Sequence, residues 1–425
     1  MTNNSGHIDG QLFMQHKALI PLLILVSLLT INPRINGWNE ASRMALTQSL
    51  VEHHELTIDK STFAATGDKV YVNGHYYSDK PAAPSLLAAL VYFPLHHLGV
   101  ELSYGWSLAY YLIIFFIIKS LWIFSILAFG TVMRLLGTTP RQALINTMIY
   151  AFASQLFTWS STFNNHSIAA SLIMLAFAFY MRSKQEATIS NYALSGLFFG
   201  LAAASDLPTG LFFLGFAFLV LRVHQHSTLK LAFIGAGMLP LAIHSALNYQ
   251  IGGTLLPLQF IREYLNFDGS QWSEGVRVNT PLSFLEYMFL SFVGPQGFLV
   301  YSPLVAFLIP LLVKHSNKKK PFYQESRVIA ASSILLLLTY FILTQNYGGW
   351  GYGIRWFVPL IPLIYIFLFD VDVALLSSRR RWLFSGLVYY SFIVAVIGLI
   401  NPWSNPEIHA FPILANLKQL SQFLF

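Results

Sequence analysis

The chain has 425 residues, of which 55% are hydrophobic and only 10% are charged, and its formal net charge is +7. In soluble domains about a quarter of the residues are charged, so this composition indicates a polytopic membrane protein. Its excess positive charge is then expected in short loops rather than on a nucleic-acid-binding surface. The chain contains no cysteine, which excludes disulfide bonds, thiol nucleophiles and thiolate metal sites.

Apolar segments predict about eleven transmembrane helices, at residues 17–33, 106–130, 143–160, 168–181, 191–204, 207–221, 231–247, 298–313, 328–344, 357–371 and 382–400. If the N-terminus is cytoplasmic, the cytoplasmic connections hold basic residues such as Arg134, Arg182, Lys314 and Arg379, in agreement with the positive-inside rule. This orientation requires that the short segment Ala82–Leu98 lies at the outer interface without crossing. Residues 1–425 are expected to form a single all-α membrane-embedded domain without a soluble C-terminal domain.

Two long loops, at about residues 34–105 and 248–297, are then on the outer side, and loops of this length usually carry function. In the first loop, Trp38–His54 has the pattern of a helix lying at the membrane surface. The following stretch KVYVNGHYY predicts a small β-hairpin whose two-residue turn is Asn73-Gly74.

The first outer loop also carries a concentration of ionisable side chains. Glu40 and Arg43 are three residues apart and share a helix face, although an exposed ion pair has the same spacing. The hairpin could fold Tyr77, Asp79 and Lys80 back toward Glu40. The sequence therefore predicts two acids and two bases at one place on the outer leaflet.

Further polar side chains lie at the outer ends of predicted spans. Asn165 and His166 follow the third span and are candidates for binding, although a lone histidine there is also typical of an interface anchor. Asp206 precedes Pro208, and we expect it to cap a helix in a tight turn; the alternative is a functional acid, because a carboxylate near hydrocarbon is costly.

Three basic residues complete the set of candidates. Arg262 in the second outer loop could meet an anionic headgroup or act as an interfacial anchor. Arg355 follows four glycines in QNYGGWGYGIRW and offers a planar fork suited to phosphate, whereas snorkelling from a helix end is the alternative. Lys119 lies within a span and needs a buried partner.

Six segments occur in a fixed order: Trp-Asn-Glu-x-x-Arg, GHYYSDKPAAPSLLAALVY, STFNNHSIAASL, NYQIGGTLLPLQF, GFLVYSPLVAF and GGWGYGIRWFVPLIPLI. In this order they resemble the GT-C superfamily of membrane glycosyltransferases, in its branch of bacterial protein O-mannosyltransferase-like and aminoarabinose-transferase-like enzymes. The resemblance covers about residues 30–370. It implies a multi-pass protein of the cytoplasmic (inner) membrane with its active site on the periplasmic or extracellular side.

The resemblance further implies an enzyme that transfers a sugar from a polyprenyl-phosphate-linked donor, with inversion, to a hydroxyl or amine of a lipid, glycan or protein acceptor. Since a glycosyl phosphate already has a good leaving group, the chemistry needs cations on the phosphate and one carboxylate as base. The alternatives are a transporter or flippase of lipid-linked sugars and a non-catalytic relative.

The family pattern assigns roles to particular residues. Its usual Asp-Glu pair reads Asn39-Glu40 here, so Glu40 is the expected catalytic base. Arg43, Lys80 and Arg355 are expected to bind the donor phosphate. The residues expected to bind acceptor or donor are Asn39, Tyr77, Asp79, Asn165, His166 and Arg262. The acid of the family's next outer loop is matched only loosely by Asn165 and His166, so a divalent metal ion stays open and no metal ligand is assigned.

Overall fold

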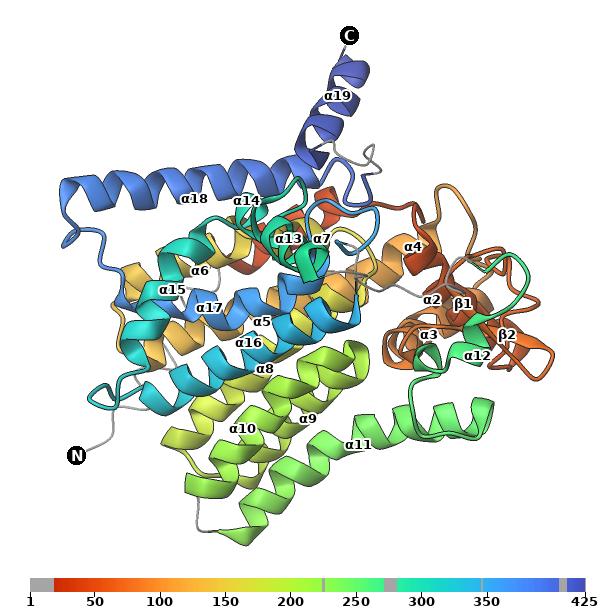
Figure 1. The fold of residues 1–425 in the computed structure, drawn as a ribbon, viewed down its shortest axis with the longest axis horizontal. Helices are drawn as coiled ribbons and strands as arrows, with labels where there is room; N and C mark the ends of the chain where they lie inside the picture. The colour runs from red at the N-terminus through yellow and green to blue at the C-terminus, as the bar shows by residue number, and fades with distance from the viewer. Residues whose placement is uncertain (1–18, 224–225, 271–280, 345–346, 405–410, 425) are drawn as a thin grey trace.

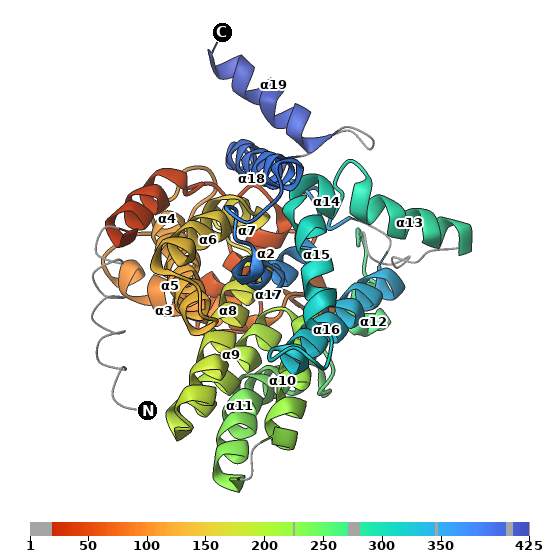
Figure 2. The ribbon, with the colours of Figure 1, turned by 90° about the vertical axis from the view of Figure 1, so that its left-hand side faces the viewer.

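The computed structural model describes residues 19–223, 226–270, 281–344, 347–404 and 411–424. The protein is an all-α polytopic membrane protein with one small hairpin. Its long helices α5 (Ser120–Leu135), α8 (Asn165–Gln185), α16 (Tyr323–Leu343) and α18 (Ser378–Gly398) run in similar directions (Figure 1). Figure 2 looks along this direction and shows α5 and α18 nearly end-on.

Among the described residues, five helices are long and apolar enough to cross a membrane, and a bent pair raises this number to six. One of them is the continuous helix Leu108–Leu135, which consists of α4 (Leu108–Ile113), the π-helical segment η2 (Ile114–Lys119) and α5. Three shorter apolar helices are Leu19–Thr30, Ile189–Ser205 and Leu207–Arg222. The total of about eleven crossings stays a prediction.

The helices α8, α9 (Ile189–Ser205) and α11 (Ser227–Gly252) pack side by side, and α9 lies between the other two. The contact between α9 and α11 depends on glycine. A Cβ atom on Gly200 would lie 1.9 Å from the backbone oxygen of Gly237, and one on Gly196 would lie 2.0 Å from that of Phe233. The two backbones therefore touch, as small residues permit in membrane bundles. The following η3 (Leu207–Thr209) and α10 (Gly210–Val223) pack against both α9 and α16.

Several predicted spans are interrupted. The segment 143–160 divides into α6 (Pro140–Phe152) and α7 (Gln155–Trp159). After α13 (Pro281–Val293), the segment 298–313 divides into α14 (Phe298–Tyr301) and α15 (Leu304–His315) at Pro303, and the chain bends there by 93°.

The segment 357–371 does not form one α-helix either. It consists of the 3₁₀ segment η5 (Arg355–Leu360), the short α17 (Ile361–Tyr365) and the 3₁₀ segment η6 (Ile366–Asp370). Pro359 and Pro362 lack the N–H group that an α-helix uses. Residues 357–368 are all buried, and η5 and α17 pack against α8. The apolar character of this segment therefore reflects a place inside the protein rather than contact with lipid.

The first outer loop folds into a compact unit at one end of the bundle, which we call the outer cap (Figure 1). It consists of α2 (Trp38–Gln48), the π-helical η1 (Ser49–His53), β1 (Lys69–Val72), β2 (His75–Ser78) and α3 (Ala82–His97). The short segments η4 (Leu258–Phe260) and α12 (Arg262–Leu265) of the second outer loop join it, and α12 packs against β1. Residues 271–280 of that second loop lie outside the described residues.

The predicted hairpin is confirmed. Val72 pairs with His75, and the two turn residues Asn73 and Gly74 have φ values of 51° and 91°, as a tight two-residue turn requires. The predicted helix beginning at Trp38 is also present, but residues 39–48 are all buried, so α2 lies inside the protein and not at the membrane surface as expected. At the C-terminal end, α19 (Pro412–Leu424) packs against α18 and extends away from the bundle.

Candidate functional site

Glu40 lies in the first turn of α2, where its carboxylate closes the N-terminus of the helix. Its Oε2 atom accepts the backbone N–H groups of Asn36 at 2.8 Å and Gly37 at 3.1 Å, and Oε1 accepts the hydroxyl groups of Tyr110 and Thr162. The side chain is completely buried, and this burial raises the pKa of the Glu40 carboxyl group. Since a carboxylate offers about four lone-pair positions, all of them are occupied.

Arg43 follows one turn later and faces the N-terminus of α8. Its Nη1 atom donates to the backbone oxygen of Asn39 at 2.9 Å and to Oδ1 of the same residue at 2.5 Å. Its Nη2 atom donates to Oδ1 of Asn165 at 2.9 Å. Burial and the nearby charge of Arg355 lower the pKa of Arg43 to about 10. Asn39 therefore positions the guanidinium group, and Nε of Arg43 is buried without a hydrogen-bond partner in the described part of the chain.

Arg355 is the first residue of η5, and its charge acts on Arg43. Its guanidinium carbon lies 4.5 Å from the ring centre of Trp403, a favourable cation–π distance. The residue is only 9% exposed, so it does not snorkel to the surface. Burial lowers the pKa of Arg355 to about 10, although the charge of Asp68 opposes this change. Within the described ranges, its buried Nε and Nη1 atoms have no hydrogen-bond partner.

At one position of the glycine-rich segment before Arg355, close packing explains why the residue is glycine. Gly353 has a φ of 76°, and a Cβ atom there would lie 2.0 Å from Nε2 of Gln155. Only glycine fits this conformation and this space. The same Nε2 atom donates to the backbone oxygen of Tyr352 at 2.9 Å, which fixes the segment against α7.

Lys80 lies just beyond β2 and bridges two carboxylates. Its Nζ atom is 2.9 Å from Oδ2 of Asp68 and 2.9 Å from Oδ2 of Asp79. Ser42 on α2 donates a weaker hydrogen bond of 3.4 Å to Oδ1 of Asp79. Burial raises the pKa of the Asp79 carboxyl group, and the charge of Lys80 opposes this effect. The Asp-Lys pair that the sequence singled out is thus a buried three-membered ion cluster joined to α2.

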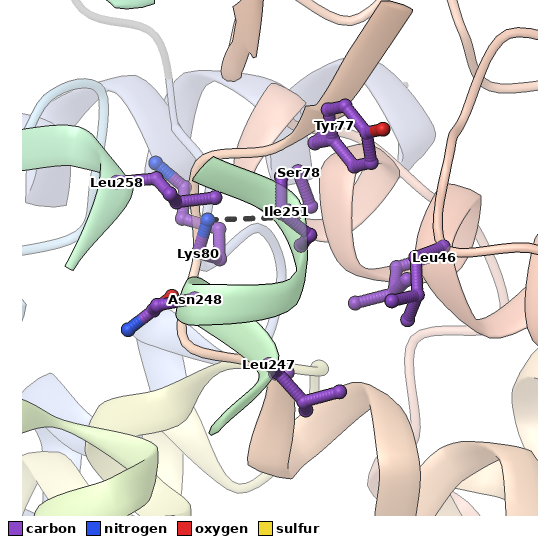
Figure 3. A pocket seen from close by; sticks show the side chains of 10 residues that line it. Leu46, Tyr77, Ser78, Lys80, Leu247, Asn248, Ile251 and Leu258 are labelled. Atoms are coloured by element: carbon purple, nitrogen blue, oxygen red, sulfur yellow. Dashed lines mark hydrogen bonds between the residues drawn. The ribbon is translucent and has the colours of Figure 1, made fainter. Parts of the chain in front are cut away.

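A small pocket opens beside Lys80 (Figure 3). Its walls come from α2, the end of the hairpin, the C-terminal part of α11 and η4. The lining residues are Leu46, Leu56, Tyr77, Ser78, Lys80, Ala82, Leu247, Asn248, Ile251 and Leu258. The free space inside it is only about 20 Å³, room for little more than a water molecule, so the pocket is far smaller than a typical ligand pocket. Most of the lining is apolar, so the pocket combines one amino group with a hydrocarbon surface.

His166 and Asp206 form a second buried pair at the N-terminal end of α8. Nδ1 of His166 lies 2.7 Å from Oδ2 of Asp206, and the hydroxyl of Tyr340 on α16 donates to Oδ1 of Asp206 at 3.2 Å. Asp206 was expected to cap a helix, but its side chain makes no capping hydrogen bond. Asp206 therefore occupies the N-cap position before η3, but the expected side-chain cap is not formed, because the carboxylate turns toward the histidine and the tyrosine instead.

The structure brings most of the predicted site residues together, with one exception. Asn39, Arg43 and Asn165 are joined by hydrogen bonds, and Tyr77 lines the pocket beside Lys80. Arg262, in contrast, is exposed at the start of α12, and no described hydrogen bond or ion pair connects it to this group.

Several contributing residues were not foreseen from the sequence: Asp68, Tyr110, Thr162, Tyr340 and Trp403. Asp68 directly precedes the hairpin, which was a usable signal, whereas Trp403 lies after the last predicted span and carried none. Lys119, for which no partner could be named, donates to the hydroxyl groups of Thr30 at 2.7 Å and Ser160 at 3.0 Å.

The donor groups present do not fit a divalent metal ion. Across the described ranges, no group of three or more histidine, aspartate or glutamate side chains is placed to hold one. Asp68 and Asp79 are two neighbouring carboxylates, but both contact the Lys80 amino group. We therefore derive no step through a metal.

Solved structures similar to this one identify the fold. ArnT from Cupriavidus metallidurans in the apo state matches with a TM-score of 0.52 and 13% identity over 85% of this chain, which spans 60% of the ArnT chain. ArnT bound to undecaprenyl phosphate matches with a TM-score of 0.55 and 12% identity over 90% of this chain and 69% of ArnT. The archaeal oligosaccharyltransferase AglB from Archaeoglobus fulgidus, in complex with an inhibitory peptide and a dolichol-phosphate, gives a TM-score of 0.47 and 14% identity over 93% of this chain and 57% of AglB.

No protein-family model matches the sequence, and no curated protein matches it. The likeness is therefore one of structure. This chain shares its fold with ArnT, so the resemblance that the six sequence segments indicated is confirmed at the level of the fold.

Proposed function

We propose that the protein is a glycosyltransferase that moves a sugar from a polyprenyl-phosphate-linked donor to a hydroxyl or amine acceptor at the outer face of the cytoplasmic membrane, with inversion at the anomeric carbon. The observation that carries this proposal is the pair of buried guanidinium groups, Arg43 and Arg355. Both retain buried N–H groups without a partner in the described part of the chain.

Two buried cations, of which Arg355 lowers the pKa of Arg43, are unfavourable without an anion. Each buried donor without a partner costs about 1–3 kcal/mol. A phosphate group between Arg43 and Arg355 would accept these N–H groups and offset the repulsion, because guanidinium groups bind phosphate through paired, charge-assisted hydrogen bonds. The arrangement is thus suited to an anion with several oxygen atoms, such as the phosphate of the donor or of the departing lipid.

The pocket beside Lys80 supplies the second requirement of a lipid-linked donor. Its polar members are Lys80, Asn248, Ser78 and the hydroxyl of Tyr77, and the leucine and isoleucine side chains around them suit a hydrocarbon chain. With about 20 Å³ of free space the pocket does not hold a polyprenyl segment as it stands, so a lipid chain would enter it only after the lining side chains move apart. The structural neighbour ArnT was crystallised with undecaprenyl phosphate, which supports the same class of ligand here.

The proposed reaction follows from these groups. The acceptor oxygen or nitrogen bonds to the anomeric carbon while the bond from that carbon to the phosphate oxygen breaks. The electron pair stays on the phosphate, where positive charge stabilises it. Inversion follows from a single displacement.

The acceptor must also lose a proton. The sequence-based proposal of Glu40 as the base requires that its carboxylate gives up one of the four hydrogen bonds it accepts.

The first test measures binding of undecaprenyl phosphate, since every such transfer releases a polyprenyl phosphate whatever the sugar. In protein reconstituted into nanodiscs, Arg355→Ala should weaken this binding about tenfold to a hundredfold, because a hydrogen bond to a charged group contributes about 1.5–3 kcal/mol. The control is Arg380→Ala, which removes the same charge from an exposed position. Equal affinity in wild type and Arg355→Ala would contradict the proposed phosphate site.

A second measurement separates transfer from transport. Membranes containing the protein receive radiolabelled undecaprenyl-phosphate sugars, and the label is followed. We expect label to leave the donor lipid for another fraction. Label that only crosses the bilayer while still on its lipid would identify a flippase instead.

A further inference from the structure

The reaction proposed above needs a proton acceptor, and the carboxylates around the phosphate site are already engaged. Glu40 accepts four hydrogen bonds at the start of α2. Asp68 and Asp79 both contact the Lys80 amino group. Asn39 stands where a carboxylate would be expected, and its side-chain oxygen accepts from Arg43 at 2.5 Å. Glu40 thus has its lone-pair positions occupied, and the amide of Asn39 is not a base. Asp68 and Asp79 are each paired with the charge of Lys80.

We propose that His166, oriented by Asp206, is the general base that removes the proton of the acceptor. This inference rests on the proposed glycosyl transfer. It assigns a catalytic role to His166 and a positioning role to Asp206.

The hydrogen bonds around Asp206 determine which nitrogen of His166 is free. An ionised carboxylate can only accept, so the contact of 2.7 Å places the proton of the neutral imidazole on Nδ1. The lone pair is then on Nε2. Nε2 makes no hydrogen bond to a described residue. It is also not completely buried. A carboxylate that holds Nδ1–H and leaves Nε2 free is the arrangement of a histidine general base.

The position of His166 places this lone pair beside the phosphate site. The adjacent residue, Asn165, accepts a hydrogen bond from Arg43 at 2.9 Å. The charges of Arg43 and Arg355 both act on His166, and the charge of Asp206 acts on both arginines. The pair and the arginines are therefore close enough for their charges to interact, near the junction of α2, the N-terminus of α8 and η5.

The proton and electron pairs balance in this arrangement. The acceptor forms its bond to the anomeric carbon and transfers its proton to Nε2 of His166. The bond to the phosphate breaks, and the phosphate leaves with the electron pair near Arg43 and Arg355. The imidazolium is stabilised by Asp206 and then releases its proton to water. Histidine suits this step because its protonation changes near neutral pH.

The competing explanation is structural, because Asp206 also joins α9 to His166 on α8 and to Tyr340 on α16. The two explanations predict different kinetics. A structural lock would affect folding and the affinity for lipid phosphate, whereas a general base affects turnover alone and can be replaced by a small base from solution.

The experiment compares His166→Ala, His166→Asn and Asp206→Asn with wild type, in membranes that transfer label from a radiolabelled undecaprenyl-phosphate sugar. Asparagine at position 166 keeps a donor toward Asp206 but cannot take up a proton. We expect kcat to fall about 10²–10⁴-fold in both His166 variants, with little change in KM for the donor or in the affinity for undecaprenyl phosphate. Added imidazole should restore part of kcat in His166→Ala and have no effect on wild type.

The chain provides a matched control. His75 and Asp59 form an exposed pair in the outer cap with the same Nδ1–Oδ2 distance of 2.7 Å, and His75→Ala should leave kcat unchanged.

Retained kcat in His166→Ala would overturn the inference. So would a loss of kcat that imidazole does not rescue and that accompanies weaker binding of undecaprenyl phosphate. Transfer by the His166 variants together with its loss in Glu40→Gln would assign the base to Glu40. A wild-type protein that neither binds undecaprenyl phosphate nor transfers label would overturn the proposed function itself.

Discussion

At the scale of single residues, the site depends on which charged groups have partners and which do not. Glu40 and Lys80 have the partners that a buried charge requires. Arg43 and Arg355 have only part of theirs in the described part of the chain. The difference indicates that the acid at the start of α2 and the lysine after the hairpin shape the site, whereas the arginines are the groups with free capacity for a ligand.

The buried carboxyl group of Glu40 makes stability depend on pH in a defined direction. Because burial raises its pKa above the ordinary value of 4.5, the folded protein binds this proton more tightly than the unfolded chain does. The contribution of Glu40 to the free energy of unfolding is therefore greatest below pH 4.5 and decreases as the pH rises through the raised pKa.

The comparison with Glu40→Gln isolates this contribution, because all other titrating groups are shared. We expect the melting temperature of wild type, relative to that of the variant, to decrease as the pH rises over this interval. Thermal unfolding of both proteins in nanodiscs across acidic to neutral pH provides the measurement. Two parallel profiles would show that the Glu40 carboxyl group has the same pKa in the folded and unfolded states.

At the scale of elements, the sequence predicted those helices and turns correctly whose conformation depends mainly on the residues within them. The Asn-Gly pair fixed the hairpin, because two successive residues with positive φ form a tight turn. The long apolar runs of α5, α8 and α16 became long helices. The run at 357–371 became a 3₁₀ and α mixture buried in the protein, because its prolines interrupt the α-helical hydrogen bonds. Hydropathy could not distinguish burial in protein from burial in lipid.

The contact of α9 with α11 gives a prediction about stability. Gly200→Ala places a methyl group on the backbone oxygen of Gly237, so the helices must separate, and we expect a loss of about 1–3 kcal/mol in the free energy of unfolding. Gly235→Ala on α11 is the control, since a Cβ atom there meets nothing within 4 Å. This control should be neutral or more stable, because alanine favours a helix by about 1 kcal/mol over glycine. Chemical or thermal unfolding in detergent measures both, and equal stability of the two variants would show that the helix contact is not tight.

At the scale of the whole molecule, the bundle holds the outer cap over the ends of α8 and η5, and the site forms where they meet. Its residues come from positions 39 to 403 of the chain. The fold is shared with ArnT at only 12–13% identity, which is possible because the fold depends on apolar packing that many sequences provide.

The orientation of the bundle is a prediction that the absence of cysteine makes simple to test. We expect a cysteine introduced as Lys60→Cys, an exposed position of the outer cap, to react with a membrane-impermeant maleimide in intact cells. One introduced as Arg380→Cys, at the start of α18, should react only after permeabilisation. The reverse pattern would place the outer cap in the cytoplasm and remove the basis for a reaction at the outer face.

The sequence by itself determined the membrane class, the hairpin and the resemblance to GT-C enzymes, because composition, turn chemistry and ordered motifs are properties of local stretches. It also placed Arg43, Lys80, Asn165 and Arg355 in one candidate site. Only the tertiary structure decided which of these groups are satisfied. The partners of Glu40 include Tyr110 and Thr162, and those of His166 include Asp206, and such pairings depend on how helices meet in space rather than on spacing along the chain.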